Sequence, residues 1–323
     1  MDYTHVSTLS SQISNDIPAK TISETSCFQK KRSLVYRLHT LWLFSRSDLK
    51  TVLFPQTVFG CVMMLSGETF GFREHIYFLE ILGRLPLIMI WIWINLLGEV
   101  IANQRLAGSI TEDSINKPWR PLPSKRVSPD EARRLLLWVL PSSYLTGVLL
   151  GDSDASVALM VFSYMYNDLD GANENWLLRN LLNACGLSLF SLGAAKVAWG
   201  PDSTPGHIVY RWIAILAAVI SSTVQLQDLP DVEGDKARGR RTMPLVYGDA
   251  LARWSICVSV LFWSLCCPYY WNLHLIGYLP SVSLGGVIGA RSCMAKNSKA
   301  DAVTWKLWCV WIGVLYLLPL HGQ

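Results

Sequence analysis

Long apolar stretches recur along this chain of 323 residues, and they constrain its fold more than any other feature. A stretch of about 17–25 apolar residues is long enough to cross the hydrocarbon core of a bilayer as a helix. We place nine such stretches, at 50–67, 76–102, 134–150, 155–170, 181–199, 208–228, 252–270, 272–290 and 303–320. Because a backbone surrounded by lipid must satisfy its hydrogen bonds internally, the expected fold is all-α, a polytopic integral membrane protein of about nine transmembrane helices.

The composition also indicates that the protein is surrounded by a lipid bilayer. Only 16% of the residues are charged, whereas a soluble domain usually carries about 25%. Much of the surface is therefore expected to face lipid, and no nucleic-acid partner is expected.

Basic residues are concentrated in alternate loops, and this asymmetry predicts an orientation. The loops 103–133, 171–180, 229–251 and 291–302 carry nearly all of the loop lysines and arginines, while the opposite loops hold little beyond Arg73. We therefore expect a cytosolic N-terminus and a C-terminus on the far side. No organelle address is visible, so the expected location is the endoplasmic reticulum membrane.

Two regions are expected from the distribution of polar residues. Residues 1–47 are polar and rich in Ser and Thr, which predicts a cytosolic and largely disordered tail. Residues 48–323 contain no Gly/Ser linker and are expected to form a single membrane domain. Most of the eight Cys lie inside apolar stretches without metal-ligand spacing, and we interpret them as small buried hydrophobic residues.

Three carboxylates stand at the cytosolic end of the sixth apolar stretch. Asp228, Asp231 and Asp235 are spaced i, i+3 and i+7, so a helix would place all three on one face. Like charges on one face repel unless a cation collects them, and Mg²⁺ is bound by one or two carboxylates together with substrate phosphates. The alternative is a solvated acidic loop that balances the basic residues after it. We favour a metal site, because carboxylates at a membrane helix end are usually functional.

A basic run follows immediately, formed by Lys236, Arg238, Arg240 and Arg241. Arginine suits bidentate contacts with phosphate, and lysine supplies a point charge. Simple anchoring on the positive side of the membrane explains the same residues equally well.

The second apolar stretch offers a facing set of oxygens. Asn95, Glu99 and Asn103 are spaced i, i+4 and i+8, which places them on one helix face at the cytosolic end. Amide and carboxylate oxygens both suit a hard cation. A polar seam between packed helices is the alternative interpretation. The loop 116–126 that follows is stiffened by prolines, which would hold its basic side chains in place.

These motifs resemble those of the UbiA superfamily of membrane prenyltransferases, whose members have nine helices and two Asp-rich motifs. The resemblance extends over about 45–320; residues 228–244 are similar to the second motif, and 116–126 resemble the loop after the first. Family members hold a prenyl diphosphate through Mg²⁺, so the resemblance implies the same cofactor and the same class of substrate here.

The resemblance also implies individual roles. Asp231 and Asp235 would be Mg²⁺ ligands supported by Asp228, and Lys117, Arg120 and Arg179 would contact the diphosphate. The first motif of the family has Asn followed by two Asp at intervals of four, where this chain has Asn95, Glu99 and Asn103. Compared with the family motif, this side of the site has one negative charge fewer, and its remaining carboxylate is carried by the longer side chain of Glu99.

The altered motif and the Asn-Lys-Pro-Trp-Arg-Pro loop resemble a fungal branch of the superfamily, which includes the membrane-bound sesquiterpene cyclase of fumagillin biosynthesis. This resemblance implies a lyase of secondary metabolism that cyclises farnesyl diphosphate to a bergamotene-type hydrocarbon. A cyclase needs a dry pocket with aromatic faces that stabilise a carbocation. The spans offer Trp91, Trp93, Trp138, Tyr144, Phe162, Tyr164, Tyr166 and Trp212, although packing or interfacial anchoring explains any single one.

Two other functions fit parts of the pattern. A prenyltransferase would use the same ionising residues and pass the carbocation to an aromatic or polyketide acceptor. A transporter would also place polar residues such as Arg84 in its spans, but it predicts broken helices at the bilayer midplane. The carboxylates here cluster at the cytosolic ends of two spans instead.

Overall fold

The structure is a computed structural model that describes residues 32–70, 78–201, 205–294 and 297–321. The chain divides into two compact units, Met1–His39 and Thr40–Gln323. Most of the predicted tail, residues 1–31, lies outside the described residues. All of the site described below belongs to the second unit.

Every regular element in the described ranges is helical, which confirms the all-α prediction. The elements are α1 (Leu34–Ser45), η1 (Leu49–Leu53), α2 (Phe54–Leu65), α3 (Phe78–Gln104), α4 (Ala107–Asn116), α5 (Pro129–Leu150), α6 (Ser153–Asn167), α7 (Gly171–Glu174), α8 (Trp176–Trp199), α9 (His207–Thr223), η2 (Val224–Asp228), α10 (Val232–Arg238), α11 (Met243–Tyr247), α12 (Asp249–Tyr270), α13 (Leu275–Met294), α14 (Ser298–Leu317) and η3 (Leu318–Leu320). The boundary predicted at residue 47 falls after α1.

The length and apolarity of the helices give a lower number of spans than the sequence predicted. Among the described residues, five helices are long and apolar enough to cross a membrane, and a sixth crossing is present if the bent pair Leu34–Ser45 and Leu49–Leu65 counts as one. The predicted count of nine is therefore not confirmed. The helix α6 has only 15 residues, and α13 is rich in Gly and Ser, which lowers its mean hydropathy.

Two apolar cores hold the long helices together. One centres on α2, α3 and α8, where Trp91, Ile92 and Phe190 are buried. The other centres on α9, α12 and α14, where Trp212 and Trp311 are buried. The helices α3 and α8 approach closely because residue 193 is Gly: a Cβ there would lie 1.9 Å from Cη2 of Trp91. The cavity described below lies where these two groups of helices meet.

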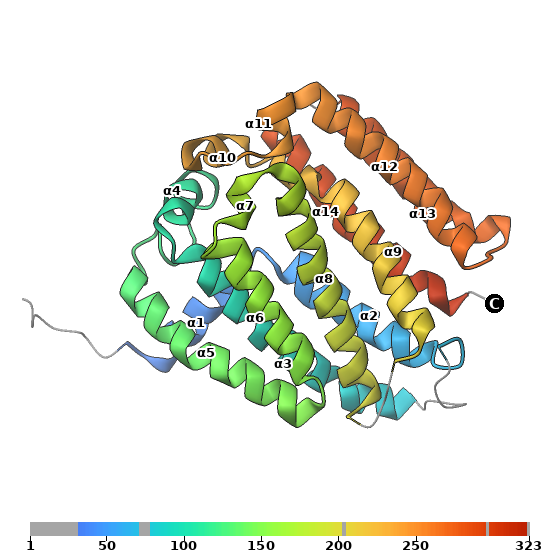
Figure 1. Ribbon diagram of the computed structural model, residues 1–323, viewed down its shortest axis with the longest axis horizontal. Coiled ribbons are helices and arrows are strands. Elements are labelled where there is room, and N and C mark those ends of the chain that lie inside the picture. The colour runs from blue at the N-terminus through green and yellow to red at the C-terminus, as the bar shows by residue number, and fades with distance from the viewer. Residues whose placement is uncertain (1–31, 71–77, 202–204, 295–296, 322–323) are drawn as a thin grey trace, which may run out of the picture. The chain divides into compact units, whose positions relative to one another are not determined.

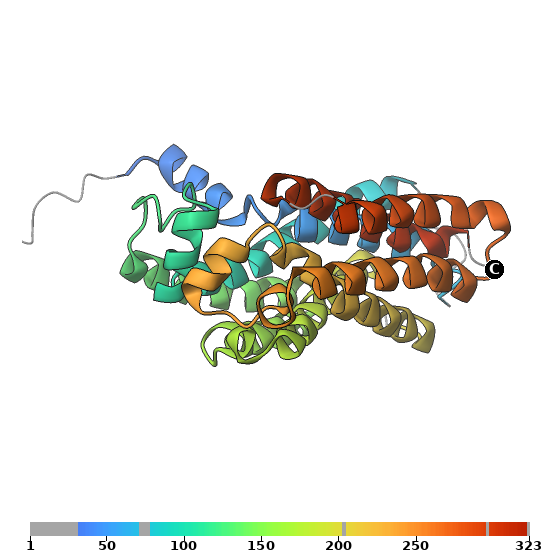
Figure 2. The same ribbon diagram turned by 90° about the horizontal axis from the view of Figure 1, so that it is seen from above.

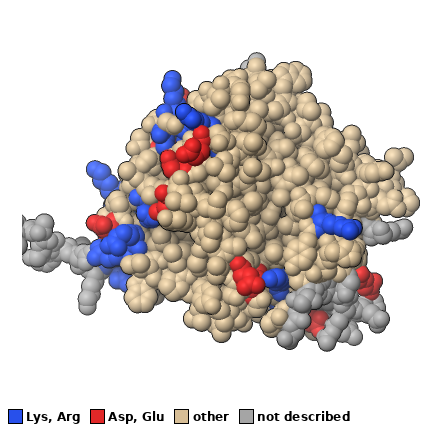
Figure 3. All heavy atoms as spheres, in the orientation of Figure 1, with Lys and Arg blue, Asp and Glu red and all other residues tan. Residues whose placement is uncertain are grey.

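The short helices α4 and α10 lie at the same end of the long helices (Figures 1 and 2) and pack against each other. They follow α3 and η2, so both belong to the loops that the sequence places on the cytosolic side. On the face shown in Figure 3, Lys, Arg, Asp and Glu gather over this end, whereas most of the remaining face carries uncharged side chains. Large apolar side chains such as Trp138, Trp254 and Leu275 are exposed, as expected for a surface that contacts lipid.

Candidate functional site

A cavity of about 950 Å³ opens between η1, α3, α6, α8, η2, α10 and α14. This volume is at the upper end of the range of about 300–1,000 Å³ that is usual for small-molecule sites. Charged side chains including Lys117 and Asp231 line one part of it. Its apolar part is lined by Leu159, Phe162, Leu182, Leu187 and Phe190. The cavity is therefore amphipathic, as a ligand with an anionic head and a hydrocarbon chain requires.

The Asp-rich segment is not one continuous helix. The helix α9 tightens into η2, which ends at Asp228, and α10 starts only after Asp231. Pro230 lies in the break and has no backbone N–H to donate to a helix. The single helix that would place all three carboxylates on one face is therefore wrong, and each carboxylate has its own surroundings.

Asp228 forms a buried ion pair. Its Oδ1 accepts hydrogen bonds from Arg179 Nη2 at 2.9 Å and from Nε at 3.3 Å. Arg179 also donates to the hydroxyl of Tyr166, which lines the cavity. The side chains of Asp228 and Arg179 are 1% and 7% exposed, so this pair lies behind the cavity wall. Oδ2 of Asp228 has no hydrogen-bond partner in the described structure.

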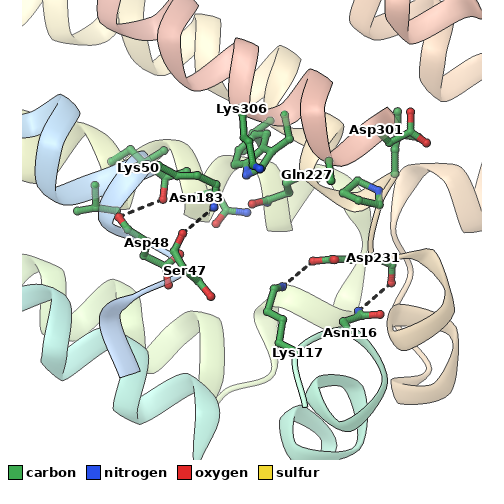
Figure 4. A pocket seen from close by; sticks show the side chains of 18 of the residues that line it. Ser47, Asp48, Lys50, Asn116, Lys117, Asn183, Gln227, Asp231, Asp301 and Lys306 are labelled. Atoms are coloured by element: carbon green, nitrogen blue, oxygen red, sulfur yellow. Dashed lines mark hydrogen bonds and ion pairs between the residues drawn. The ribbon is translucent and has the colours of Figure 1, made fainter. Parts of the chain in front are cut away.

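Asp231 lies at the cavity itself. Its Oδ2 accepts a hydrogen bond from Lys117 Nζ at 2.7 Å, and its backbone carbonyl accepts one from Asn116 Nδ2 at 3.1 Å (Figure 4). Both side chains of the ion pair are partly exposed, at 25% and 28%. The pair joins the end of α4 to the start of α10, and it presents a cation and a carboxylate to a bound ligand.

Asp235 is buried without a hydrogen bond. Neither carboxylate oxygen has a hydrogen-bond partner among the described residues, and the side chain is 1% exposed. Arg240 Nε lies 3.4 Å from Oδ1, which is within ion-pair distance, but the geometry of a hydrogen bond is not met. Burial raises the pKa of Asp235 to about 8, and Arg179 opposes this rise. An unpaired buried carboxylate is costly, so this residue has the character of a ligand-binding group.

These carboxylates fit a divalent cation that arrives with a phosphate. In the part of the chain that the structure describes, no three His, Cys, Asp or Glu residues are close enough to form a metal cage by themselves. Mg²⁺ does not need one, because it takes one or two carboxylates together with substrate phosphates and water. The accessible carboxylate of Asp231 supplies one such ligand at the cavity. Asp228 and Asp235 do not line the cavity, but each has a carboxylate oxygen without a hydrogen-bond partner behind its wall.

The three residues of the altered first motif separate in the structure. Glu99 lines the cavity and has no hydrogen bond or ion pair with any described residue. Asn95 is buried and donates to the carbonyl of Trp91 at 2.9 Å. Asn103 donates to Oδ1 of Asn167 at 2.7 Å. The polar-seam interpretation thus describes Asn103, which joins α3 to α6, whereas the hydrogen bond of Asn95 stays within α3. Of the three, Glu99 alone lines the cavity.

The remaining predicted phosphate contacts also differ in position. Arg120 lines the cavity, but it donates to both oxygens of Asp113 at 2.8 and 3.0 Å. Lys236 is exposed on α10 and does not line the cavity. The structure therefore brings Glu99, Lys117, Arg120 and Asp231 together at the cavity. The other predicted site residues do not line it: Asn95, Asn103, Arg179, Asp228, Asp235 and Lys236.

The arginines after the Asp-rich segment have a packing role that the sequence did not reveal. Arg238 Nη1 and Arg240 Nη2 lie 3.1 and 2.9 Å from Oε2 of Glu112 on α4. All three side chains are largely buried. These ion pairs fix α4 against α10 and so hold Lys117 close to Asp231.

Several polar cavity residues were not among the predicted site residues. Four of them are Lys50 of η1, Asn183 of α8, Gln227 of η2 and Lys306 of α14. Each lies in or beside an apolar stretch, and the four are far apart in the chain. Only the isolated polar positions inside those stretches could have indicated them.

Of the aromatic residues proposed to stabilise a carbocation, Phe162 and Tyr166 line the cavity. Trp91 and Trp212 are fully buried in the two cores, and Trp138 is exposed. The others lie elsewhere: Trp93 donates to Ser45, Tyr164 lines a smaller cavity of about 260 Å³, and Tyr144 is exposed. Phe190 is a cavity aromatic that was not predicted.

The fold agrees with the comparisons with known proteins. Residues 53–312 match the model of the UbiA prenyltransferase family. The chain belongs to this family, whose members act on prenyl diphosphates, and it is an integral membrane protein. The transporter interpretation is therefore set aside.

Among its relatives is somaliensene A/B synthase of Streptomyces somaliensis, which is 31% identical over 90% of this chain and 95% of its own length. Fumagillin beta-trans-bergamotene synthase of Aspergillus fumigatus is 26% identical over 88% of this chain and 93% of its own length. The solved UbiA homologue from Archaeoglobus fulgidus bound to DMAPP and Mg²⁺ has a TM-score of 0.60 at 12% identity, covering 86% of this chain and 98% of that one. The last likeness concerns the fold alone.

Proposed function

We propose that this protein is a Mg²⁺-dependent terpene cyclase that ionises farnesyl diphosphate and cyclises it to a bergamotene-type sesquiterpene. The observation that carries the proposal is the amphipathic cavity, with Lys117 and Asp231 at its polar part and Phe162 and Phe190 in its apolar part. The similarity to two terpene synthases along most of the chain supports it.

The polar residues would work on the leaving group. Lys117 donates from the wall of the cavity, and Asp231, Asp235 and Glu99 would hold Mg²⁺ that arrives with the diphosphate. The metal supplies Lewis acidity that stabilises the charge on the departing oxygens. Arg179 is committed to Asp228, so its contribution is to fix that carboxylate and the hydroxyl of Tyr166.

The apolar residues would determine the fate of the carbocation. Phe162, Tyr166 and Phe190 offer aromatic faces to a positive charge, and leucines exclude water that would otherwise capture it. Without an acceptor, the nearest nucleophile is another double bond of the same chain. A cyclised hydrocarbon is the product that this arrangement favours.

We also propose the orientation in which α4 and α10 face the cytosol, with the protein in the endoplasmic reticulum membrane. The contact between α4 and α10 supports it, because the two most basic predicted loops then lie at one end. Protease protection of tags placed in each loop of sealed microsomes tests it, and a protected tag between α3 and α5 would contradict it.

The catalytic proposal is tested in microsomes that contain the full-length protein and Mg²⁺. Farnesyl diphosphate should give a volatile hydrocarbon without an added acceptor, and geranyl and geranylgeranyl diphosphates should react more slowly. Recovery of a prenylated aromatic product only when an acceptor is supplied would favour the transferase alternative. Uptake of a solute without release of diphosphate would contradict both enzymes.

Gly186 provides a probe of the cavity wall. It lines the cavity, and no atom lies within 4 Å of the position of an added Cβ. Gly186→Leu should therefore fill part of the apolar region and shift products toward acyclic or shorter-chain compounds while ionisation continues. An unchanged product spectrum would indicate that the hydrocarbon chain binds elsewhere.

A further inference from the structure

Two lysines outside the Asp-rich segment reach the cavity from different helices. Lys50 comes from η1 and Lys306 from α14, and these two elements pack against each other. Figure 4 shows both side chains pointing into the same part of the cavity, beside Asn183 and Gln227. The pair of Lys117 and Asp231 lies in a different part of the same view. The cavity therefore contains a second group of positive charge.

Neither lysine of this second group lies within ion-pair distance of a carboxylate in the described structure, although Asp48, Glu99 and Asp301 line the same cavity. Asp301 of the same cavity accepts hydrogen bonds at 2.8 Å from both Nη1 and Nη2 of Arg253. Asp48 lies 3.8 Å from Arg120. Lys50 Nζ donates once, to the carbonyl of Ser47 at 2.7 Å, so most of its donor capacity is left for a ligand.

A buried amide donor points to the same place. Nδ2 of Asn183 is inaccessible to solvent and has no hydrogen-bond partner among the described residues. Buried polar atoms are nearly always paired, so an unpaired one beside a cavity indicates a missing partner. Two converging ammonium groups and one amide N–H are all donors. The missing partner is therefore an acceptor with negative charge.

We propose that Lys50, Lys306 and Asn183 form a second anion subsite that binds a phosphate group without a metal ion. Identifying this anion as the diphosphate leaving group rests on the proposed function. When the allylic C–O bond breaks, its electron pair stays on the diphosphate oxygen and the carbon chain keeps the positive charge. A metal-free subsite of donors would hold the diphosphate apart from the carbocation until cyclisation is complete and so prevent recombination.

Direct binding to the full-length protein in detergent micelles tests the subsite. Inorganic diphosphate is titrated calorimetrically in the presence of EDTA, so that the carboxylates cannot contribute through a metal. Each charge-assisted hydrogen bond is strong, so Lys306→Gln and Lys50→Gln should each weaken binding about tenfold. Lys306→Arg should keep most of the affinity. Lys299→Gln is the matched control, because Lys299 is exposed on the same helix and does not line the cavity.

Wild-type affinity in both Gln variants would overturn the subsite. Glycerol 3-phosphate is titrated in parallel, because a phosphate carried by an acceptor has the same chemistry. Binding of glycerol 3-phosphate without binding of diphosphate would overturn the assignment to the leaving group. The size-exclusion profile of each variant must match that of the wild type, which separates loss of binding from loss of folding.

A kinetic measurement links the subsite to turnover. With Mg²⁺ present, Lys306→Gln should raise the inhibition constant of the product diphosphate about tenfold, while KM for farnesyl diphosphate changes less than about threefold. An equal change in both constants would contradict a separate subsite. If the wild type consumes no prenyl diphosphate but binds diphosphate through Lys306, the proposed function fails and the subsite stands. The reverse result removes the subsite alone.

Discussion

The two polar sides of the cavity differ in how their charges are balanced. On the α4–α10 side, Asp231 pairs with Lys117 and two arginines pair with Glu112. On the α3 side, Glu99 is the only charged residue of its motif, and it reaches the cavity without a partner. On the proposed function, we therefore expect the α4–α10 side to carry most of the metal and diphosphate binding. Glu99 would complete the site from across the cavity.

The largest effect is expected on the α4–α10 side. Asp231→Asn should lower turnover of farnesyl diphosphate on the order of 10³-fold, because it removes a metal ligand and the partner of Lys117. Asp130→Asn, at an exposed position on α5, is the control and should retain activity. Activity of Asp231→Asn within tenfold of the wild type would mean that this side does not hold the metal.

Glu99→Gln tests the other side and should have a smaller effect. We expect a loss of about 10–100-fold together with weaker Mg²⁺ dependence, because a single carboxylate on this side supports a metal held elsewhere. Steady-state rates at several Mg²⁺ concentrations measure both quantities. A loss larger than that of Asp231→Asn would reverse the comparison.

The two buried carboxylates near the α4–α10 side, Asp228 and Asp235, are compared by the thermal stability of their variants. Asp228→Asn leaves the buried guanidinium of Arg179 without its countercharge and should destabilise the protein by about 3–5 kcal/mol. Above pH 8, where the Asp235 carboxyl is ionised, Asp235→Asn removes a buried charge that has no hydrogen bond and should raise the Tm of the metal-free protein by about 2–4 °C. Thermal unfolding in detergent with EDTA measures both, and both variants should lose activity. Destabilisation by Asp235→Asn would show that Arg240 pairs with it effectively.

The smallest effect is expected from restoring the family residue at position 103. Asn103 faces Asn167 instead of the cavity, so Asn103→Asp should leave turnover and Mg²⁺ dependence within about threefold of the wild type. The assay is the one used for Glu99→Gln. A clear rise in Mg²⁺ affinity would show that residue 103 reaches the metal after all.

Much of this arrangement was predictable because membrane helices and metal ligands leave regular patterns. The length and spacing of the apolar stretches predicted an all-α membrane protein, and the spacing of the Asp residues predicted the segment that contains Asp231. The break at 229–231 was not predicted. Spacing of i, i+3 and i+7 fits a continuous helix, but a bent segment can have the same spacing. The Pro in that segment was the available indication.

Other features depend on contacts between distant segments. Lys50, Asn183 and Lys306 are brought together only by packing of η1, α8 and α14, and no local pattern marks them. Likewise, Arg238 and Arg240 look like phosphate ligands in the sequence but pair with Glu112 of α4. Local spacing predicts which face a residue occupies. It does not predict which partner that face will meet.

The separation of the cavity into a polar and an apolar part has a consequence for how this family diversifies. Lys117 and Asp231 stand at the ends of α4 and α10, whereas Leu159, Gly186, Leu187 and Phe190 lie within the bodies of α6 and α8. Substitutions within those two helices can reshape the apolar part of the cavity and leave the residues that we propose to bind the diphosphate in place. Enzymes that make new carbon skeletons can therefore evolve by single substitutions, without inactive intermediates.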